Sequence, residues 1–155
     1  MRLALYQPDI PQNLGAAIRV AACFGVGLEI IEPCGFPLTD KALKRAALDY
    51  GALAQVERRA GFKDFLAAPP RQAGRLVLVE TDAIVTLDRF VFRPGDTLIL
   101  GRESAGVADE VLEAAQASVR IPMARGARSL NVAVAAAVAL AEALRQTGGL
   151  SRLEA

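Results

Sequence analysis

Two loops of this sequence carry polar residues at spacings that could support chemistry. The first, from Pro8 to Gly15, contains Asn13 and is followed by Arg19 on an expected helix. Arg19 lies six residues after Asn13, between one and two helical turns, so its guanidinium could hold a phosphate at the same end of a sheet. The alternative interpretation of Arg19 is an ordinary solvated helix residue. The second loop, Gly101 to Gly106, has glycines that permit close backbone approach, but it lacks the dinucleotide and phosphate-loop patterns, so neither NAD nor ATP is favoured.

Basic residues gather in two further places. Three cations follow one another at helical spacing and share one face of an expected helix: Lys41, Lys44 and Arg45. That face is either an exposed amphipathic surface or a patch that binds RNA phosphates. The loop from Arg120 to Asn131 contains Arg125 and Arg128 and no acidic residue, so it is locally cationic. Ser129 in this loop either caps the final helix or faces a ligand at the helix N-terminus.

Length and composition limit the classes of protein to consider. The 155 residues suit one domain, expected to span 1–155, and 53% hydrophobic content is enough for a sizeable core. Eighteen basic residues nearly balance 17 acidic ones, so net charge indicates neither a nucleic-acid nor a membrane partner. Histidine is absent and the two cysteines lack a metal-ligand pattern, so we expect no metal site and no histidine-based catalysis.

Short apolar runs alternate with helical patterns, which predicts an α/β fold with a mainly parallel sheet and helices on both faces. The expected strands are Arg2–Tyr6, Leu28–Ile31, Leu53–Glu57, Leu76–Val79, Thr97–Leu100 and Ser118–Ile121. The expected helices are Asn13–Phe24, Thr39–Ala47, Phe62–Ala68, Asp109–Ala117 and Leu130–Gln146, with Asn13 and Thr39 as N-caps. In such folds ligands bind beyond the carboxyl ends of the strands, where the loops described above would lie.

Three other segments carry expectations of their own. An exposed turn is predicted at 67–74, and a frayed tail at 147–155. The longest apolar run, Val132–Ala141, is too short to cross a bilayer, so a cytoplasmic protein without a membrane partner is expected. Because this final helix has no polar face before Glu142, it should be buried in the core or against a second subunit.

Taken together, the loops resemble the SPOUT class of RNA methyltransferases, and within it the bacterial tRNA (cytidine(34)-2'-O)-methyltransferases. Matching motifs occur in family order from Tyr6 to about Gln146. They are Pro8-x-Ile10-Pro11-x-Asn13-x-Gly15-x-x-x-Arg19, Ile31-Glu32-Pro33-x-Gly35-Phe36, Leu48-Asp49-Tyr50, Gly101-x-Glu103-x-x-Gly106, Ile121-Pro122-Met123 and Ser129-Leu130-Asn131. Each motif is weak by itself, and their joint occurrence makes the match specific.

The resemblance implies a C-terminal trefoil knot, S-adenosylmethionine as cofactor, and a homodimer with sites near the subunit interface. It assigns catalytic motif positions to Asn13, Arg19, Glu103, Ser129 and Asn131. It places the cofactor against Val79, Gly101, Ile121, Ser129 and Leu130.

The implied reaction is methylation of the ribose 2'-oxygen of the wobble nucleotide, C34 or modified U34, in the tRNA anticodon stem-loop. The candidate bases are Glu103, Arg19 or a phosphate-assisted water. Since a guanidinium stays protonated, we expect Arg19 to clamp a phosphate while Ser129 and Asn131 position the ribose. Backbone contacts are expected from Lys41, Lys44, Arg45, Arg125 and Arg128, and the 2'-hydroxyl excludes DNA as substrate. The alternatives are methylation of ribosomal RNA and a non-catalytic α/β RNA-binding module.

Overall fold

The computed structural model describes residues 1–47, 50, 53 and 55–153. Its strands are β1 (Arg2–Tyr6), β2 (Gly27–Ile31), β3 (Val56–Arg59), β4 (Leu76–Val79), β5 (Thr97–Leu100) and β6 (Ala117–Val119). Its helices are α1 (Pro11–Cys23), α2 (Asp40–Ala47), α3 (Phe62–Ala67), α4 (Pro69–Gln72), α5 (Asp109–Ala114), α6 (Val132–Gln146) and the 3-10 helix η2 (Leu150–Arg152). Two positions of the expected motif at 48–50, Leu48 and Asp49, lie outside the described residues.

All six strands form one parallel sheet in the order β3-β2-β1-β5-β4-β6, as expected of an α/β protein. The central strands β1, β5 and β4 are buried along almost their whole length because helices cover both of their faces. The strand order reverses between β1 and β5. Loops that leave the carboxyl ends of neighbouring strands diverge at such a point and leave room for a ligand.

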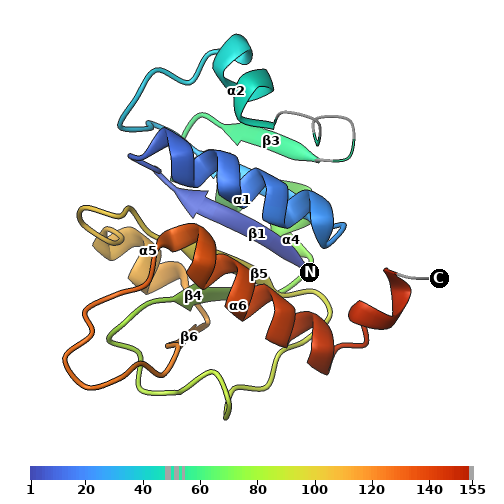
Figure 1. Cartoon of the computed structure of the whole chain (residues 1–155), viewed down its shortest axis with the longest axis vertical. Helices are drawn as coiled ribbons and strands as arrows, with labels where there is room; N and C mark the ends of the chain where they lie inside the picture. Colours follow the sequence, from blue (N-terminus) through green and yellow to red (C-terminus); the bar gives the residue numbers. More distant parts are fainter. Residues whose placement is uncertain (48–49, 51–52, 54, 154–155) are drawn as a thin grey trace.

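Helices α1 and α6 lie side by side on one face of the sheet, and α3 and α5 lie on the other (Figure 1). The first face buries alternate strand residues such as Leu3, Leu5 and Leu98. The second buries the residues between them, including Ala4 and Ile99. This period of two follows from the pleat of a strand. No helix of the described residues is long and apolar enough to span a membrane.

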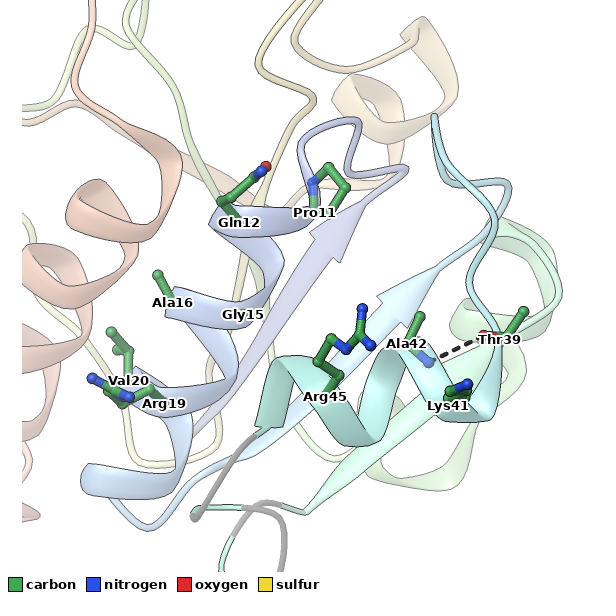
Figure 2. Close-up of a pocket in the computed structure, with 10 residues that line it drawn as sticks. All are labelled: Pro11, Gln12, Gly15, Ala16, Arg19, Val20, Thr39, Lys41, Ala42 and Arg45. Carbon is green, nitrogen blue, oxygen red and sulfur yellow. Dashed lines mark hydrogen bonds between the residues drawn. The ribbon is translucent and has the colours of Figure 1, made fainter.

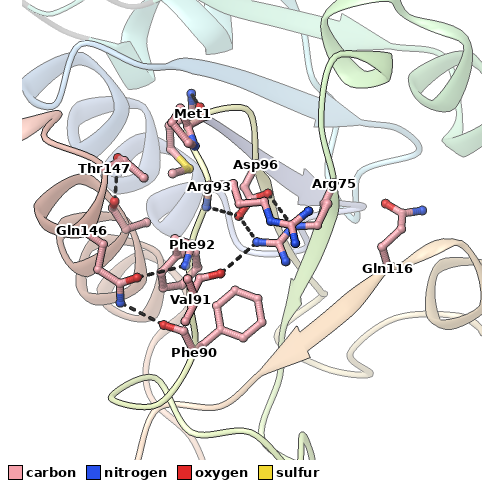
Figure 3. Close-up of polar contacts among 12 residues, drawn as sticks. Met1, Arg75, Phe90, Val91, Phe92, Arg93, Asp96, Gln116, Gln146 and Thr147 are labelled. Carbon is pink, nitrogen blue, oxygen red and sulfur yellow. Dashed lines mark hydrogen bonds and ion pairs between the residues drawn. The ribbon is translucent and has the colours of Figure 1, made fainter.

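The connection from β4 to β5, residues 80–96, is tied to both neighbouring layers (Figure 3). Gln146 at the end of α6 donates from Nε2 to the carbonyl of Phe90 at 2.9 Å and accepts the amide of Phe92 at 2.9 Å. Arg75 holds the other end of the connection through an ion pair of 2.7 Å with the buried Asp96. The long connection is therefore fixed although it contains no regular element.

Several predicted boundaries were wrong, each for a local reason. Pro11 opens α1, so Asn13 lies inside the helix and does not cap it. The expected turn at 67–74 contains the short helix α4, again opened by proline. The strand predicted at Leu53–Glu57 includes Ala54, which lies outside the described residues. The observed β3 continues to Arg59 because Arg58 and Arg59 form ion pairs with Glu32 and Glu29 of the neighbouring chain segment.

The chain after α6 also contains regular structure. Helix η2 lies within the segment that was expected to fray, and the amide of Gly149 donates to the carbonyl of Leu144 at 2.8 Å.

The predicted N-cap of α2 is confirmed. The side-chain oxygen of Thr39 accepts the amide of Ala42 at 3.0 Å.

Candidate active site

A cavity of about 640 Å³ opens at the carboxyl ends of β4 and β5. That volume lies within the range of small-molecule sites, which is about 300–1,000 Å³. Its lining joins segments from four remote parts of the sequence: the β1–α1 loop, the segment after β4, the loop after β5, and the chain from Ile121 to the start of α6. All five expected cofactor residues line it, namely Val79, Gly101, Ile121, Ser129 and Leu130. Four of the five expected catalytic residues also line it, namely Asn13, Glu103, Ser129 and Asn131.

Three of these side chains form one hydrogen-bonded chain across the cavity. Asn13 donates from Nδ2 to Oε1 of Glu103 at 2.7 Å, and its Oδ1 accepts from Nδ2 of Asn131 at 2.7 Å. Asn131 is also the N-cap of α6, because its Oδ1 accepts the amide of Ala133 at 2.9 Å. Ser129, for which capping this helix was one of two interpretations, is exposed and lies before the helix. The network therefore links the first turn of α1, the loop after β5 and the last helix.

The loop after β5 forms a tight turn that we call the glycine hairpin, residues 101–106. Arg102 and Gly106 exchange two backbone hydrogen bonds of 2.8 and 2.9 Å. A Cβ on Gly101 would lie 2.5 Å from the carbonyl carbon of Gly106, so only glycine fits there. Gly106 has a φ of +64°, which glycine adopts without strain. The hairpin therefore presents backbone and the Glu103 carboxyl directly to the cavity.

Glu103 lies against a second carboxyl group, that of Asp9. Oε2 of Glu103 accepts the amide of Asp9 at 3.3 Å, and Oδ1 of Asp9 accepts the amide of Glu103 at 3.2 Å. Burial and the neighbouring Asp9 raise the pKa of Glu103 above its usual value. Hydrogen bonds from Glu103 and Ser104 lower the pKa of Asp9 to about 2. Asp9 is thus the ionised member of the pair, and Glu103 is the better proton acceptor.

Arg19 does not line the cavity of its own chain. It lines a groove between α1 and α2, with a volume of about 1040 Å³ (Figure 2). Its guanidinium carbon lies 5.0 Å from the centroid of the Tyr50 ring, within the range of a cation–π contact. Lys41 and Arg45 line the same groove, and none of its lining residues in the described part of the chain is acidic.

The remaining expected RNA-binding residues are exposed but lie elsewhere. Lys44 lies on α2 and is not among the groove's lining residues. Arg125 and Arg128 lie on the loop that leads from β6 to α6. Asp9, which contacts Glu103 without lining the cavity, was not singled out by the sequence. An aspartate in a loop is common in turns, and only its contact with Glu103 distinguishes it.

Comparison with known proteins identifies relatives that cover almost the whole chain. The chain is 50% identical over 151 residues to a tRNA (cytidine(34)-2'-O)-methyltransferase from Beijerinckia indica, with 97% of this chain and 94% of that protein covered. It is 39% identical over 150 residues to the protein of that name from Escherichia coli, covering 96% and 94%.

Solved structures of RNA methyltransferases also resemble this chain. A structure described as structural insights into the 2-OH methylation of C/U34 on tRNA matches with a TM-score of 0.84 and 42% identity, covering 94% of each chain. The SpoU methyltransferase AviRb from Streptomyces viridochromogenes, in complex with the cofactor AdoMet, matches with a TM-score of 0.82 and 28% identity, covering 94% of this chain and 60% of that one. The model of the SpoU rRNA methylase family matches residues 1–141. The chain therefore belongs to the SpoU rRNA methylase family.

Proposed function

We propose that this protein methylates the ribose 2'-oxygen of the wobble nucleotide, C34 or modified U34, in the anticodon stem-loop of tRNA. The observation that carries the proposal is the single cavity in which Asn13, the glycine hairpin and Asn131 meet. The names of the relatives in Beijerinckia indica and Escherichia coli specify the nucleotide.

The cofactor in this proposal is S-adenosylmethionine, which the cavity fits in size and chemistry. Val79, Ile121 and Leu130 offer apolar surface for a flat ring, and Gly101 offers backbone without a side chain. Ser129 also lines the cavity. When bound, S-adenosylmethionine supplies a methyl group activated by a positively charged sulfur.

The protein's own residues would handle the substrate hydroxyl. Among the candidate bases, Glu103 lines the cavity and has a raised pKa, so we assign it as the acceptor of the 2'-hydroxyl proton. Each carboxylate oxygen has two lone pairs, so Glu103 can accept this proton while keeping its bond to Asn13. Ser129 and Asn131 would position the ribose.

A homodimer would bring Arg19 to the site. The outer surface beside α1 and α6 exposes apolar side chains, with Val134 49% and Val138 39% exposed on α6 and Ile10 40% exposed before α1. An apolar helical surface of this kind is favourable to cover with a second copy of the chain. We propose that Arg19 of the second subunit clamps a substrate phosphate beside the cavity, since a planar guanidinium can bind a phosphate with two parallel hydrogen bonds.

The tRNA backbone would follow the basic residues. Lys41 and Arg45 line the α1–α2 groove, and Arg125 and Arg128 are exposed on the loop that lies before α6. Together with Lys44, they could neutralise phosphates without reading sequence. A single-stranded anticodon loop would allow the wobble ribose to turn into the cavity.

We further propose that the chain is one SPOUT domain closed by a C-terminal trefoil knot. The support lies where the chain leaves β6. The amide of Arg120 donates to the carbonyl of Val85 at 3.0 Å, and the carbonyl of Arg120 accepts the amide of Leu87 at 2.8 Å. The chain then runs beside the 80–96 connection before it forms α6, which packs beside α1. An experimental trace of residues 80–131 would decide whether the C-terminal segment threads through that connection.

Methyl transfer from labelled S-adenosylmethionine to tRNA transcripts tests the function. We expect one methyl group per tRNA at position 34, located by mass spectrometry of digested product. A transcript with a 2'-deoxy nucleotide at position 34 should accept none, because the acceptor oxygen is missing. Labelling of ribosomal RNA instead of tRNA would replace this proposal with the first alternative, and S-adenosylmethionine binding with no transfer to either RNA would overturn it.

A further inference from the structure

Asp9 contacts the glycine hairpin with both its side chain and its backbone. Oδ1 of Asp9 accepts the amide of Glu103 at 3.2 Å, and Oδ2 accepts both the amide of Ser104, at 3.3 Å, and the Ser104 hydroxyl. In return the amide of Asp9 donates to Oε2 of Glu103 at 3.3 Å. Asp9 itself is not among the residues that line the cavity. The carboxylate therefore holds the tip of the hairpin while leaving the cavity free.

The loop after β2 supports Asp9 from another side. A Cβ on Gly35 would lie 2.6 Å from Cβ and 2.9 Å from Cα of Asp9, so this loop approaches Asp9 as closely as glycine allows. The amide of Gly35 also donates to the carbonyl of Pro8 at 3.0 Å. None of the residues of the 31–36 motif lines the cavity. Its contact through Gly35 indicates that the motif supports Asp9.

The base of the hairpin is closed, because Arg102 and Gly106 pair across it and Gly101 packs against Gly106. Its first residue, Gly101, follows β5 directly. Fixing its tip therefore fixes both the backbone that lines the cavity and the direction of the Glu103 carboxyl.

We infer that Asp9 is a positioning residue of the methyl-transfer site, one that holds the glycine hairpin in place and keeps the Glu103 carboxyl beside Asn13 as proton acceptor. The inference rests on the proposed function for the acceptor role of Glu103. The two carboxyls lie side by side with Asp9 ionised, which disfavours a second negative charge on Glu103 and strengthens it as a base. Asp9 thereby acts on the reaction through Glu103 and touches neither substrate nor cofactor.

The first test compares Asp9→Asn with the wild-type protein without cofactor. The pKa of Glu103, followed by NMR of its side-chain carboxyl carbon, should fall because the neighbouring charge is removed. The amide protons of Glu103 and Ser104 should exchange with solvent at least about tenfold faster, since they lose an ionised acceptor. If Glu103 titrates at the same pH and both amides exchange at wild-type rates, the inference is overturned.

The second test uses the pH dependence of methyl transfer. In Asp9→Asn, kcat should fall by about ten- to a hundredfold, and the acid limb of its pH profile should move to lower pH, while KM for tRNA stays within about twofold. Ser104→Ala removes the hydroxyl that donates to Asp9. The amide protons of Glu103 and Ser104 should therefore exchange faster than in the wild type, but less so than in Asp9→Asn. A loss of kcat with an unmoved acid limb and unchanged amide exchange would also count against the inference.

Matched controls separate this effect from general damage. Gly35→Ala should push on Asp9 and shift the Glu103 titration in the same direction as Asp9→Asn. Gly61→Ala should leave it unchanged, because a Cβ there meets nothing within 4 Å. Asp88→Asn replaces an aspartate with 66% side-chain exposure and should behave like wild type. If the wild-type protein transfers no methyl group while the NMR shift still occurs, the proposed function fails and the link between Asp9 and Glu103 stands.

Discussion

The cavity beyond β4 and β5 and the groove between α1 and α2 differ in how their polar side chains are held. In the cavity, Asn13 is hydrogen-bonded to both Glu103 and Asn131 at 2.7 Å, and Asn131 is fixed further because it caps α6. In the groove, Lys41 and Arg45 are exposed cations on one short helix. The cavity is therefore ordered before any ligand arrives, whereas the groove can adapt its side chains to what it binds.

This difference matches two kinds of ligand. A small cofactor and a reacting hydroxyl require groups that are already in position, because misplacement by about 1 Å can cost a hundredfold in rate. A polyanion requires positive charge spread along its path, and long flexible side chains provide it. In the proposed function, the cavity, which we call the rigid region, carries out methyl transfer. The groove between α1 and α2, which we call the adaptable region, adds affinity for tRNA.

The strongest test of the rigid region is Glu103→Gln. The amide keeps the shape of the carboxyl but cannot accept the hydroxyl proton, so kcat should fall by about 100- to 10,000-fold. Because the pKa of Glu103 is raised, the wild-type rate should be lost as pH falls through that raised pKa, and the variant should lack this acid limb. Single-turnover methylation between pH 4 and 9 measures both effects. A Glu103→Gln enzyme with near wild-type kcat would remove the assigned base.

Gly101→Ala tests whether the cavity wall tolerates a side chain. The new Cβ would lie 2.5 Å from the Gly106 carbonyl carbon, so the hairpin must shift and S-adenosylmethionine affinity should fall by about a hundredfold. The control is Gly106→Ala, where a Cβ meets nothing within 4 Å and the cost is the positive φ alone, about 1–2 kcal/mol of stability. Calorimetric titration with S-adenosylmethionine should show a larger loss of affinity for Gly101→Ala than for Gly106→Ala. Equal losses of affinity would contradict the packing argument.

Arg19 tests whether the two regions cooperate across a dimer. Arg19→Ala should lower kcat/KM by about ten- to a hundredfold without changing S-adenosylmethionine affinity, because Arg19 does not line the cavity of its own chain. Arg19→Lys should recover little, since a lysine cannot grip a phosphate with two parallel hydrogen bonds. Full activity of the lysine variant would eliminate the clamp. Mixed dimers of Arg19→Ala and Glu103→Gln chains should regain part of the activity if each site uses both subunits.

The adaptable region should give the smallest effect. Replacing Lys41 and Arg45 together with alanine should weaken tRNA affinity by about tenfold and lower the magnitude of its salt slope by about one to two. Binding of S-adenosylmethionine and the kcat at saturating tRNA should not change. Filter-binding measurements at several salt concentrations would show this, and an unchanged slope would exclude the groove as a phosphate site.

The central sheet was predictable because its strands are buried on both faces. Arg2–Tyr6, Leu76–Val79 and Thr97–Leu100 were predicted with the observed bounds. Their residues are mostly apolar whichever side they face, so the pattern is unambiguous. At the edge of the sheet, β3 was misplaced because Arg58 and Arg59 read as loop residues, and only their ion pairs explain why they lie in a strand.

The site required more than local pattern. Periodicity could not bring Asn13 within 2.7 Å of both Glu103 and Asn131, residues 90 and 118 positions away. The family resemblance predicted that Asn13, Glu103 and Asn131 belong to one site, and the structure shows the hydrogen bonds between them. Asp9 was missed because nothing local distinguishes a hydrogen-bonded aspartate from one that stabilises a turn.

The bond between Asn13 and Asn131 also sets the moment at which the site can form during synthesis. A nascent chain that has emerged only to residue 120 contains the proposed base and the glycine hairpin but not the N-cap of α6. Asn13 then lacks its second partner, and the cavity lacks the wall that Ser129 and Leu130 provide. The ribosome therefore has to release almost the whole polypeptide before a cofactor can be captured.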